Sequence, residues 1–472
     1  MLYMFRRNMK SGAAASAEAR FPALVWTIGL EMVLMLLMGS VDTWMLSAVS
    51  DGAVAAAGLS NQYVTLGLLV LRIVTVGTQV VLAQYLGAGR EREGGRAALA
   101  SLYLNSVIGG AISLLLILFS GPLLALLQTS DELMPAARSY LIWVGGSLVL
   151  QSLVNGLTAI IRIYGHTQLA MYASVGMNLA NIAGNAVLIF GLGMVPALGV
   201  TGAAVSTCLS RGLTALILLL LFARLTGIRF RMPSREVFHP EDLGKMVKVG
   251  IPSAMETFLY HAVQTVFIAL ISHLGTEALA GRQYAVNLTM FVTCFGSAFS
   301  AANMIIVGRD AGGGRFDEAY KQTWHSIRLS LAAVFIANCA VILFREPLVG
   351  LFTEDTEVIR IAGHLLLLNL FVETGKCLNM NTVSALRAVG DARFPLLMAV
   401  ISMAGISLTA GYGLTAAGLG AAGIWIATGL DEWIRGLSML GRWRSRKWEA
   451  AVLVTQHKTA APAKGGVTAA KM

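Results

Sequence analysis

An internal repeat constrains the fold of this chain more than any other feature. Three matches lie at one offset of 221 residues, and they pair Gln62 with Gln283, Gly87 with Gly308, and Gly199–Thr207 with Gly420–Thr428. A repeat of this length indicates one helical bundle written twice. Membrane proteins built in this way commonly carry a substrate between their halves by alternating access. The repeat therefore bears on function as well as on fold.

The composition places the chain in a lipid bilayer. Of its 472 residues, 56% are hydrophobic and 13% are charged, and the mean hydropathy is +0.71. Soluble globular domains average about 25% charged residues. The net charge of +10 is spread over short loops, so we interpret it as a determinant of orientation, not as a nucleic-acid surface. The four cysteines lie in apolar stretches, and no metal site or disulfide is expected.

The hydropathy pattern predicts an all-α integral membrane protein with twelve transmembrane helices in two pseudo-symmetric six-helix lobes around a central cavity. A span needs roughly 20 apolar residues. The predicted spans begin near Phe21, Ala53, Ala97, Leu133, Leu169, Gly199, Met246, Glu277, Thr323, Val358, Phe394 and Gly418. The predicted divisions are an N-terminal segment (1–20), the N-lobe (21–223), a linker (224–245), the C-lobe (246–448) and a disordered tail (449–472).

The charges of the loops predict the orientation. Loops that carry mainly arginine and lysine alternate with loops that carry mainly acids, as the positive-inside rule requires for an even number of spans. We expect a multi-pass protein of the plasma (inner) membrane with both termini cytoplasmic. No cleavable signal is expected, because the first apolar run continues past Asp42.

Several segments resemble the multidrug and toxic compound extrusion (MATE) family of transporters. They are Ser40–Thr43, Ala57–Gln62, Ala83–Gly89, Gly250–Glu256, Ala385–Phe394 and Asp431–Trp448. The resemblance implies a V-shaped pair of lobes that exports cationic or amphipathic compounds in exchange for protons or sodium ions. No other cofactor, no nucleic acid and no enzymatic activity are expected. The expected partners are small amphipathic molecules and the bilayer, and we expect a monomer.

Asp42 is the leading candidate for the coupling site. An ionisable group inside a span costs about 2.5–3.5 kcal/mol on insertion scales and is usually functional. It matches the first-helix carboxylate that binds the coupling ion in the family. A structural ion pair is the alternative role. Glu31 lies on the same helical face about 16 Å away, by helical geometry, and is either a second proton station or a group that faces a wet vestibule.

Three asparagines form a polar stripe in the fifth span, at Asn178, Asn181 and Asn185. The stripe is expected to face the N-lobe cavity, with interhelical hydrogen bonding as the alternative. Members of the family often carry aspartate at the position of Asn185. This departure puts a sodium site in doubt and favours protons, because one carboxylate suffices to carry a proton.

Arg72 lies near the middle of the second span, where a guanidinium needs a partner or water. The hypothesis is that it pairs with Asp42 in one transport state and is released in the other. A permanent pair, or a position facing a cytoplasmic cleft, is the alternative.

The candidates in the C-lobe lie on the seventh and tenth spans. Glu256 matches a family position, but Ser253–Glu256 also fits a capping box at the start of a helix. Tyr260 and Gln264 follow Glu256 at helical spacing and suit a cavity wall. In the tenth span Lys376 replaces a carboxylate of the family, and Glu373 one turn earlier can neutralise it. Lys376 either makes the cavity tolerant of neutral or anionic amphiphiles, or it pairs with Glu373 and never meets substrate.

Two other classes of protein compete with an efflux antiporter. A lipid-linked saccharide flippase would use Arg72 and Lys376 to hold a pyrophosphate, but fourteen spans are usual for that group. A membrane-embedded enzyme is the distant alternative, and the sequence has no motif for one, such as His-Glu-x-x-His.

Overall fold

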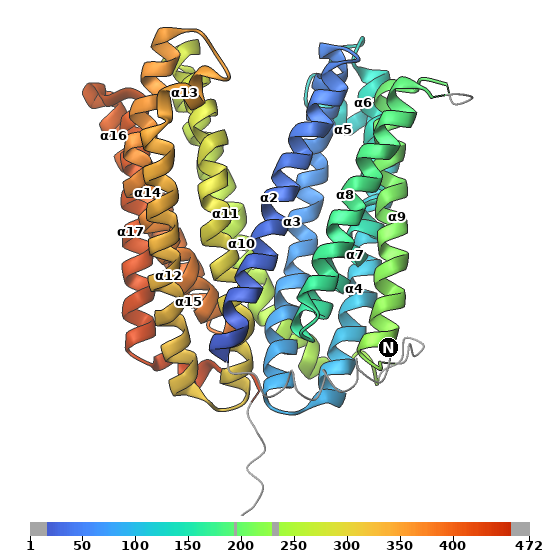
Figure 1. Cartoon of the computed structure of the whole chain (residues 1–472), viewed down its shortest axis with the longest axis vertical. Coiled ribbons are helices and arrows are strands. Elements are labelled where there is room, and N and C mark those ends of the chain that lie inside the picture. The colour runs from blue at the N-terminus through green and yellow to red at the C-terminus, as the bar shows by residue number, and fades with distance from the viewer. Residues whose placement is uncertain (1–16, 193–195, 229–235, 455–472) are drawn as a thin grey trace, which may run out of the picture.

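The computed structural model describes residues 17–192, 196–228 and 236–454, with side chains from Phe21 onwards. The described residues form helices and no strand. Two groups of helices diverge towards one end of the molecule and meet at the other, which gives a V (Figure 1). We call these the open end and the closed end. The predicted all-α fold with two lobes is confirmed.

The N-lobe contains the first six spans. Polar caps and tight turns set the helix ends, as where Ser50 accepts a hydrogen bond from the Ala53 amide at the start of α3. The elements are α2 (Ala17–Ser47), α3 (Asp51–Gly87), α4 (Glu91–Leu118), α5 (Ser120–Leu126), α6 (Met134–Tyr140), η1 (Leu141–Gly145), α7 (Leu148–Ile163), α8 (Thr167–Phe190) and α9 (Gly199–Leu225).

The C-lobe contains the other six spans. Its elements are α10 (Pro240–Ser272), α11 (Thr276–Gly312), α12 (Phe316–Leu343), α13 (Arg345–Gly350), α14 (Thr356–Ala388), α15 (Arg393–Ser402), η2 (Met403–Ser407), α16 (Leu408–Leu414), η3 (Thr415–Leu419), α17 (Gly420–Arg444) and η4 (Lys447–Ala451). The described residues hold eleven apolar helical runs, of which the longest is Arg393–Arg444. This run turns back at Gly418 (φ 90°) and Gly420 (φ 54°), so it supplies two spans and the total is twelve.

The two lobes repeat each other with a longer offset than the sequence matches indicate. Helices α3 and α11 both have 37 residues, α4 and α12 both have 28, and each pair starts 225 residues apart. The turns agree, because Gly89 and Gly314 share a φ of 72°. Only the last helices, α9 and α17, keep the offset of 221. The predicted repeat is confirmed, but its register in α3 and α11 is wrong by four residues.

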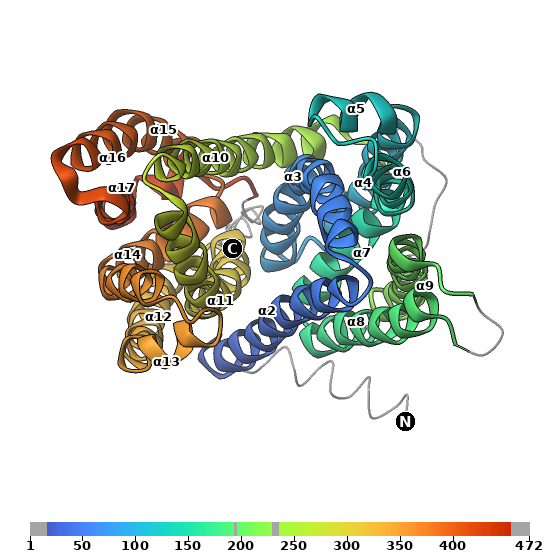
Figure 2. The same ribbon diagram turned by 90° about the horizontal axis from the view of Figure 1, so that it is seen from above.

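Helix α10 joins the lobes. It begins at Pro240, inside the segment predicted to be linker, and it packs along α3 of the N-lobe (Figure 2). A Cβ atom at Gly77 would overlap the Met246 carbonyl, so backbone meets backbone there. Asp242 accepts hydrogen bonds from Tyr85 (2.5 Å) and Arg96 (2.8 Å) beside this contact. The closed end is therefore a tightly packed seam.

The C-terminal segment also belongs to the closed end. Trp448 is fully buried and stacks on Trp443, with ring centroids 4.3 Å apart. The backbone amides of Leu453 and Val454 donate to Gln84 Oε1 at 2.9 and 3.0 Å. Residues 449–454 are thus packed, which corrects the predicted disorder there, because hydrogen bonds and two tryptophans anchor an otherwise small-residue segment. The predictions for 1–16 and 455–472 lie outside the described residues.

Candidate functional site

Asp42 lies in the open half of the N-lobe, where α2 faces α8. Its Oδ1 accepts a hydrogen bond from Asn185 Nδ2 at 2.7 Å. With its amide nitrogen turned towards Asp42, Asn181 donates a second bond at 3.1 Å, while its oxygen accepts from Thr207. The structure therefore brings together the carboxylate and two of the three asparagines of the predicted stripe. The third, Asn178, has a buried Nδ2 with no hydrogen-bond partner in the described residues.

Asp42 forms no ion pair within the described part of the chain. The hypothesis that Arg72 pairs with it is wrong for this structure. Arg72 interacts electrostatically with Glu256 and Arg387 of the C-lobe instead. The reason is depth: Asp42 lies about 8 Å from the open end of α2, whereas Arg72 lies about 32 Å along α3 from the same end, at 1.5 Å per residue.

Glu31 forms a buried ion pair, which corrects the expectation that it faces a wet vestibule. Its carboxylate binds Arg162 of α7 and accepts a hydrogen bond from Ser174 of α8 at 2.7 Å. Only 6% of the Glu31 side chain is exposed. The pair joins three helices of the N-lobe.

Glu256 forms the equivalent ion pair in the C-lobe. Arg387 Nη2 lies 2.6 Å from its Oε2, and both residues lie 225 positions after Glu31 and Arg162. Glu256 is in the middle of α10, since that helix begins at Pro240 and includes Pro252. The capping-box interpretation is therefore wrong.

A cluster of buried charges surrounds this C-lobe pair. Arg435 of α17 contacts three acids: Asp431 at 2.8 Å, Glu432 at 2.9 Å and Glu256 at 3.9 Å. Asn379 donates to Glu432 at 2.8 Å. The sequence interpretation treated Asp431–Trp448 only as a family segment. The signal was nevertheless present, because three charged residues at i, i+1 and i+4 inside an apolar helix are costly unless they are paired.

Lys376 and Glu373 form the pair that their spacing predicts. Lys376 Nζ lies 2.9 Å from Glu373 and 3.0 Å from Thr293 Oγ1. Tyr260 interacts electrostatically with both members of the pair. Gln264, one turn further along α10, accepts a hydrogen bond from Arg282 Nη2 at 3.2 Å. Arg282 is a buried cation that the sequence interpretation missed.

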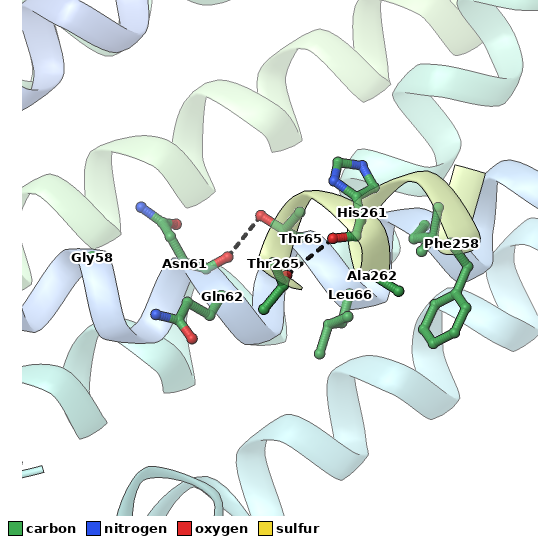
Figure 3. Close-up of a pocket in the computed structure, with 10 residues that line it drawn as sticks. Gly58, Asn61, Gln62, Thr65, Leu66, Phe258, His261, Ala262 and Thr265 are labelled. Atoms are coloured by element: carbon green, nitrogen blue, oxygen red, sulfur yellow. Dashed lines mark hydrogen bonds between the residues drawn. The ribbon is translucent and has the colours of Figure 1, made fainter. Parts of the chain in front are cut away.

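A cavity of about 630 Å³ separates the lobes between α3 and α10. Figure 3 shows Asn61, Gln62 and Thr65 of α3 opposite His261 and Phe258 of α10. The other lining residues are Gly58, Leu66, Leu69, Ala262 and Thr265. Apolar and uncharged polar side chains thus share its walls, which suits an amphipathic molecule. Within the described residues no group of three His, Cys, Asp or Glu side chains could hold a metal ion.

The closed end is held by hydrogen bonds that repeat between the lobes. Gln84 of α3 donates to the Ala388 carbonyl at 2.7 Å, and Arg309 of α11 donates to the Ile163 carbonyl. The two donors are 225 residues apart, and so are the two acceptors. Each lobe therefore binds the end of the fourth span of the other lobe.

Comparison with known proteins decides the family. The family model MatE matches residues 27–187 and 252–412, one block in each lobe. The chain belongs to the MATE family. It is 40% identical over 454 residues to the "uncharacterized transporter YisQ" of Bacillus subtilis, with 93% of this chain and 99% of that protein covered. It is 30% identical to the "probable multidrug resistance protein NorM" of Thermotoga maritima, with 91% and 92% covered.

Solved MATE structures have the same fold. An outward-facing multidrug resistance MATE transporter superposes with a TM-score of 0.84 at 20% identity, with 93% of this chain and 97% of that chain covered. The chain is thus a multi-pass membrane transporter of the MATE family, with an uncompensated carboxylate in one lobe and a charge cluster in the other.

Proposed function

We propose that this MATE transporter exports amphipathic or cationic compounds by alternating access, in exchange for protons that bind Asp42. The observation that carries the proposal is the environment of Asp42, which is half-buried and held only by neutral amides. A proton that binds there removes a buried charge, and a proton that leaves restores it. The names of the relatives, which include multidrug resistance proteins, support the substrate class.

The donors around Asp42 favour protons over sodium. Asn185 and Asn181 direct N–H groups at the carboxylate. A hard cation needs oxygen ligands, and those two amides present nitrogen to the carboxylate instead. Sodium is therefore the second choice of coupling ion.

We further propose that the closed end faces the cytoplasm. Its turns carry basic residues such as Arg90 and Arg315, whereas the open-end turns carry acids such as Asp131. The structure would then be an outward-open state, in a monomer of the plasma membrane with both termini cytoplasmic. Protons and substrate drive exchange if each binds one state better than the other.

Proteoliposomes test the proposal directly. An imposed pH gradient should drive uptake of a fluorescent cation by the wild-type protein, and a sodium gradient alone should not. Asp42→Asn should abolish the response to the pH gradient, because the amide cannot bind and release the proton. Asp131→Asn, at an exposed turn, is the matched control and should transport normally. Uphill transport by Asp42→Asn at the wild-type rate would disprove the role of Asp42.

A further inference from the structure

Arg72 lacks a partner. It lies inside α3, is exposed, and makes no hydrogen bond or ion pair with any residue that the structure describes. The other guanidiniums buried in the bundle are held by acceptors, as Arg211 is held by Val144 O (3.0 Å) and Ser147 Oγ (2.7 Å). A charged group at membrane depth needs a partner or water, so the exposed Arg72 calls for a ligand.

The register of α3 against α10 places Arg72 at the floor of the α3–α10 cavity. Close contact of the backbones begins beside it, since a Cβ atom at Gly250 would overlap the Ile73 carbonyl. The α3 residues that line the cavity recur every three or four positions down to Leu69. Arg72 is the next position of this stripe.

The direction of the side chain agrees with this position. Long side chains in a helix lie back over the turn that precedes them. For Arg72 this is the turn of Leu69, so the guanidinium extends from the floor towards the cavity.

The nearby acid does not neutralise Arg72. Glu256 already binds Arg387 at 2.6 Å and has Arg435 at 3.9 Å. Arg387 adds a second positive charge on the opposite lobe. The floor of the cavity therefore attracts anions, while its walls accept an apolar body.

We propose that the α3–α10 cavity binds amphiphiles with one anionic group, such as a carboxylate, sulfonate or phosphate, with Arg72 as the residue that binds this group. The inference rests on the proposed efflux function and extends its substrates from cations to amphipathic anions and zwitterions. The anionic group can belong to a free compound or to a lipid headgroup.

A binding measurement tests the inference without any ion gradient. The protein is placed in nanodiscs of phosphatidylcholine and titrated with a dansyl-labelled long-chain carboxylate, and separately with the alcohol-terminated analogue. Arg72→Gln should weaken binding of the carboxylate about tenfold or more, as expected for loss of a charged hydrogen bond, and leave the alcohol unchanged. Arg72→Lys should retain most of the affinity. Arg92→Gln, at an exposed position of the closed end, is the matched control.

Each outcome has one meaning. Equal affinity of wild type and Arg72→Gln for the carboxylate would overturn the inference, and unchanged binding of the alcohol shows that the variant is folded. Displacement of the probe by added phosphatidylglycerol would assign the site to a lipid headgroup, and lack of displacement would assign it to free amphiphiles. If binding fails while Asp42-dependent transport persists, only this inference fails. If binding persists without coupled transport, only the proposed function fails.

Discussion

Glu31–Arg162 and Glu256–Arg387 are the same ion pair in two lobes, but their surroundings differ. Glu31 has one cation and one hydroxyl as partners. Glu256 has Arg435 as a second cation. Removing one member of a buried pair is strongly destabilising because the other charge is left uncompensated. The second cation should therefore reduce this penalty in the C-lobe.

We predict that Arg162→Ala lowers the stability of the folded protein more than Arg387→Ala does. The cost for Arg162→Ala should be about 3 kcal/mol, typical of a broken buried pair, and it should be largely removed when Glu31→Gln is added. Thermal unfolding of the purified protein in detergent measures both effects. Arg360→Ala, in an exposed pair with Glu357, is the control and should melt like wild type. An Arg387→Ala variant that melts below Arg162→Ala would contradict the argument.

Single residues were predictable where helical periodicity alone decides their neighbours. Asp42 and Asn185 were both placed on faces towards the N-lobe cavity, and they form a hydrogen bond. Arg72 was assigned to Asp42 because both are charged and lie in adjacent helices. That assignment failed because depth along the helices separates the two residues by about 24 Å.

At the scale of elements, the C-terminal segment is the part of the closed end that has no counterpart in the other lobe. Leu453 and Val454 bind Gln84, whereas the equivalent of Gln84 is Arg309, which donates to the Ile163 carbonyl. Leu453 also packs against Gly390, whose φ of 94° requires glycine. Opening of the seam must therefore release this segment.

We predict that Gln84→Ala frees the segment. The amides of Leu453 and Val454 would lose their acceptor, and a lost hydrogen bond in a buried site costs about 1–3 kcal/mol. Hydrogen–deuterium exchange at these two amides should then become about tenfold faster or more. Gln283→Ala is the matched control, because Gln283 is exposed and bonds only Asn287 in the described residues. Unchanged exchange in Gln84→Ala would show that packing alone holds the segment.

The register of the repeat shows why elements are harder to align than to detect. An error of four residues is close to one helical turn, so every apolar face still matched at the wrong offset. The composition of residues 449–454 likewise predicted disorder, because it does not reveal that Gln84 supplies an acceptor from 369 positions earlier in the chain.

For the whole molecule, the pattern of hydropathy and charge was sufficient to predict twelve spans in two lobes. The family model covers one block in each lobe, as a duplicated bundle requires. The sequence could not predict which end of the V is closed, because this depends on how the two lobes pack and each lobe offers the same helices.

Orientation is the prediction that belongs to this scale. In a cysteine-free background, Glu132→Cys at the open end should react with a membrane-impermeant thiol reagent added to intact cells. Arg92→Cys at the closed end should react only after the cells are permeabilised. Both positions are exposed, so access to the reagent depends on the side of the membrane alone. The reverse pattern would place the closed end outside the cell.

Two glycine contacts close the seam between α3 and α11 of the two lobes. A Cβ atom at Gly87 would overlap the Arg309 carbonyl, and one at the equivalent Gly312 would overlap the Gln84 carbonyl. Main chain pressed against main chain leaves no width for a file of water molecules at these points. The junction thus acts as electrical insulation: while it holds, the membrane voltage and the proton gradient cannot discharge through the transporter, and ions cross only when the lobes move.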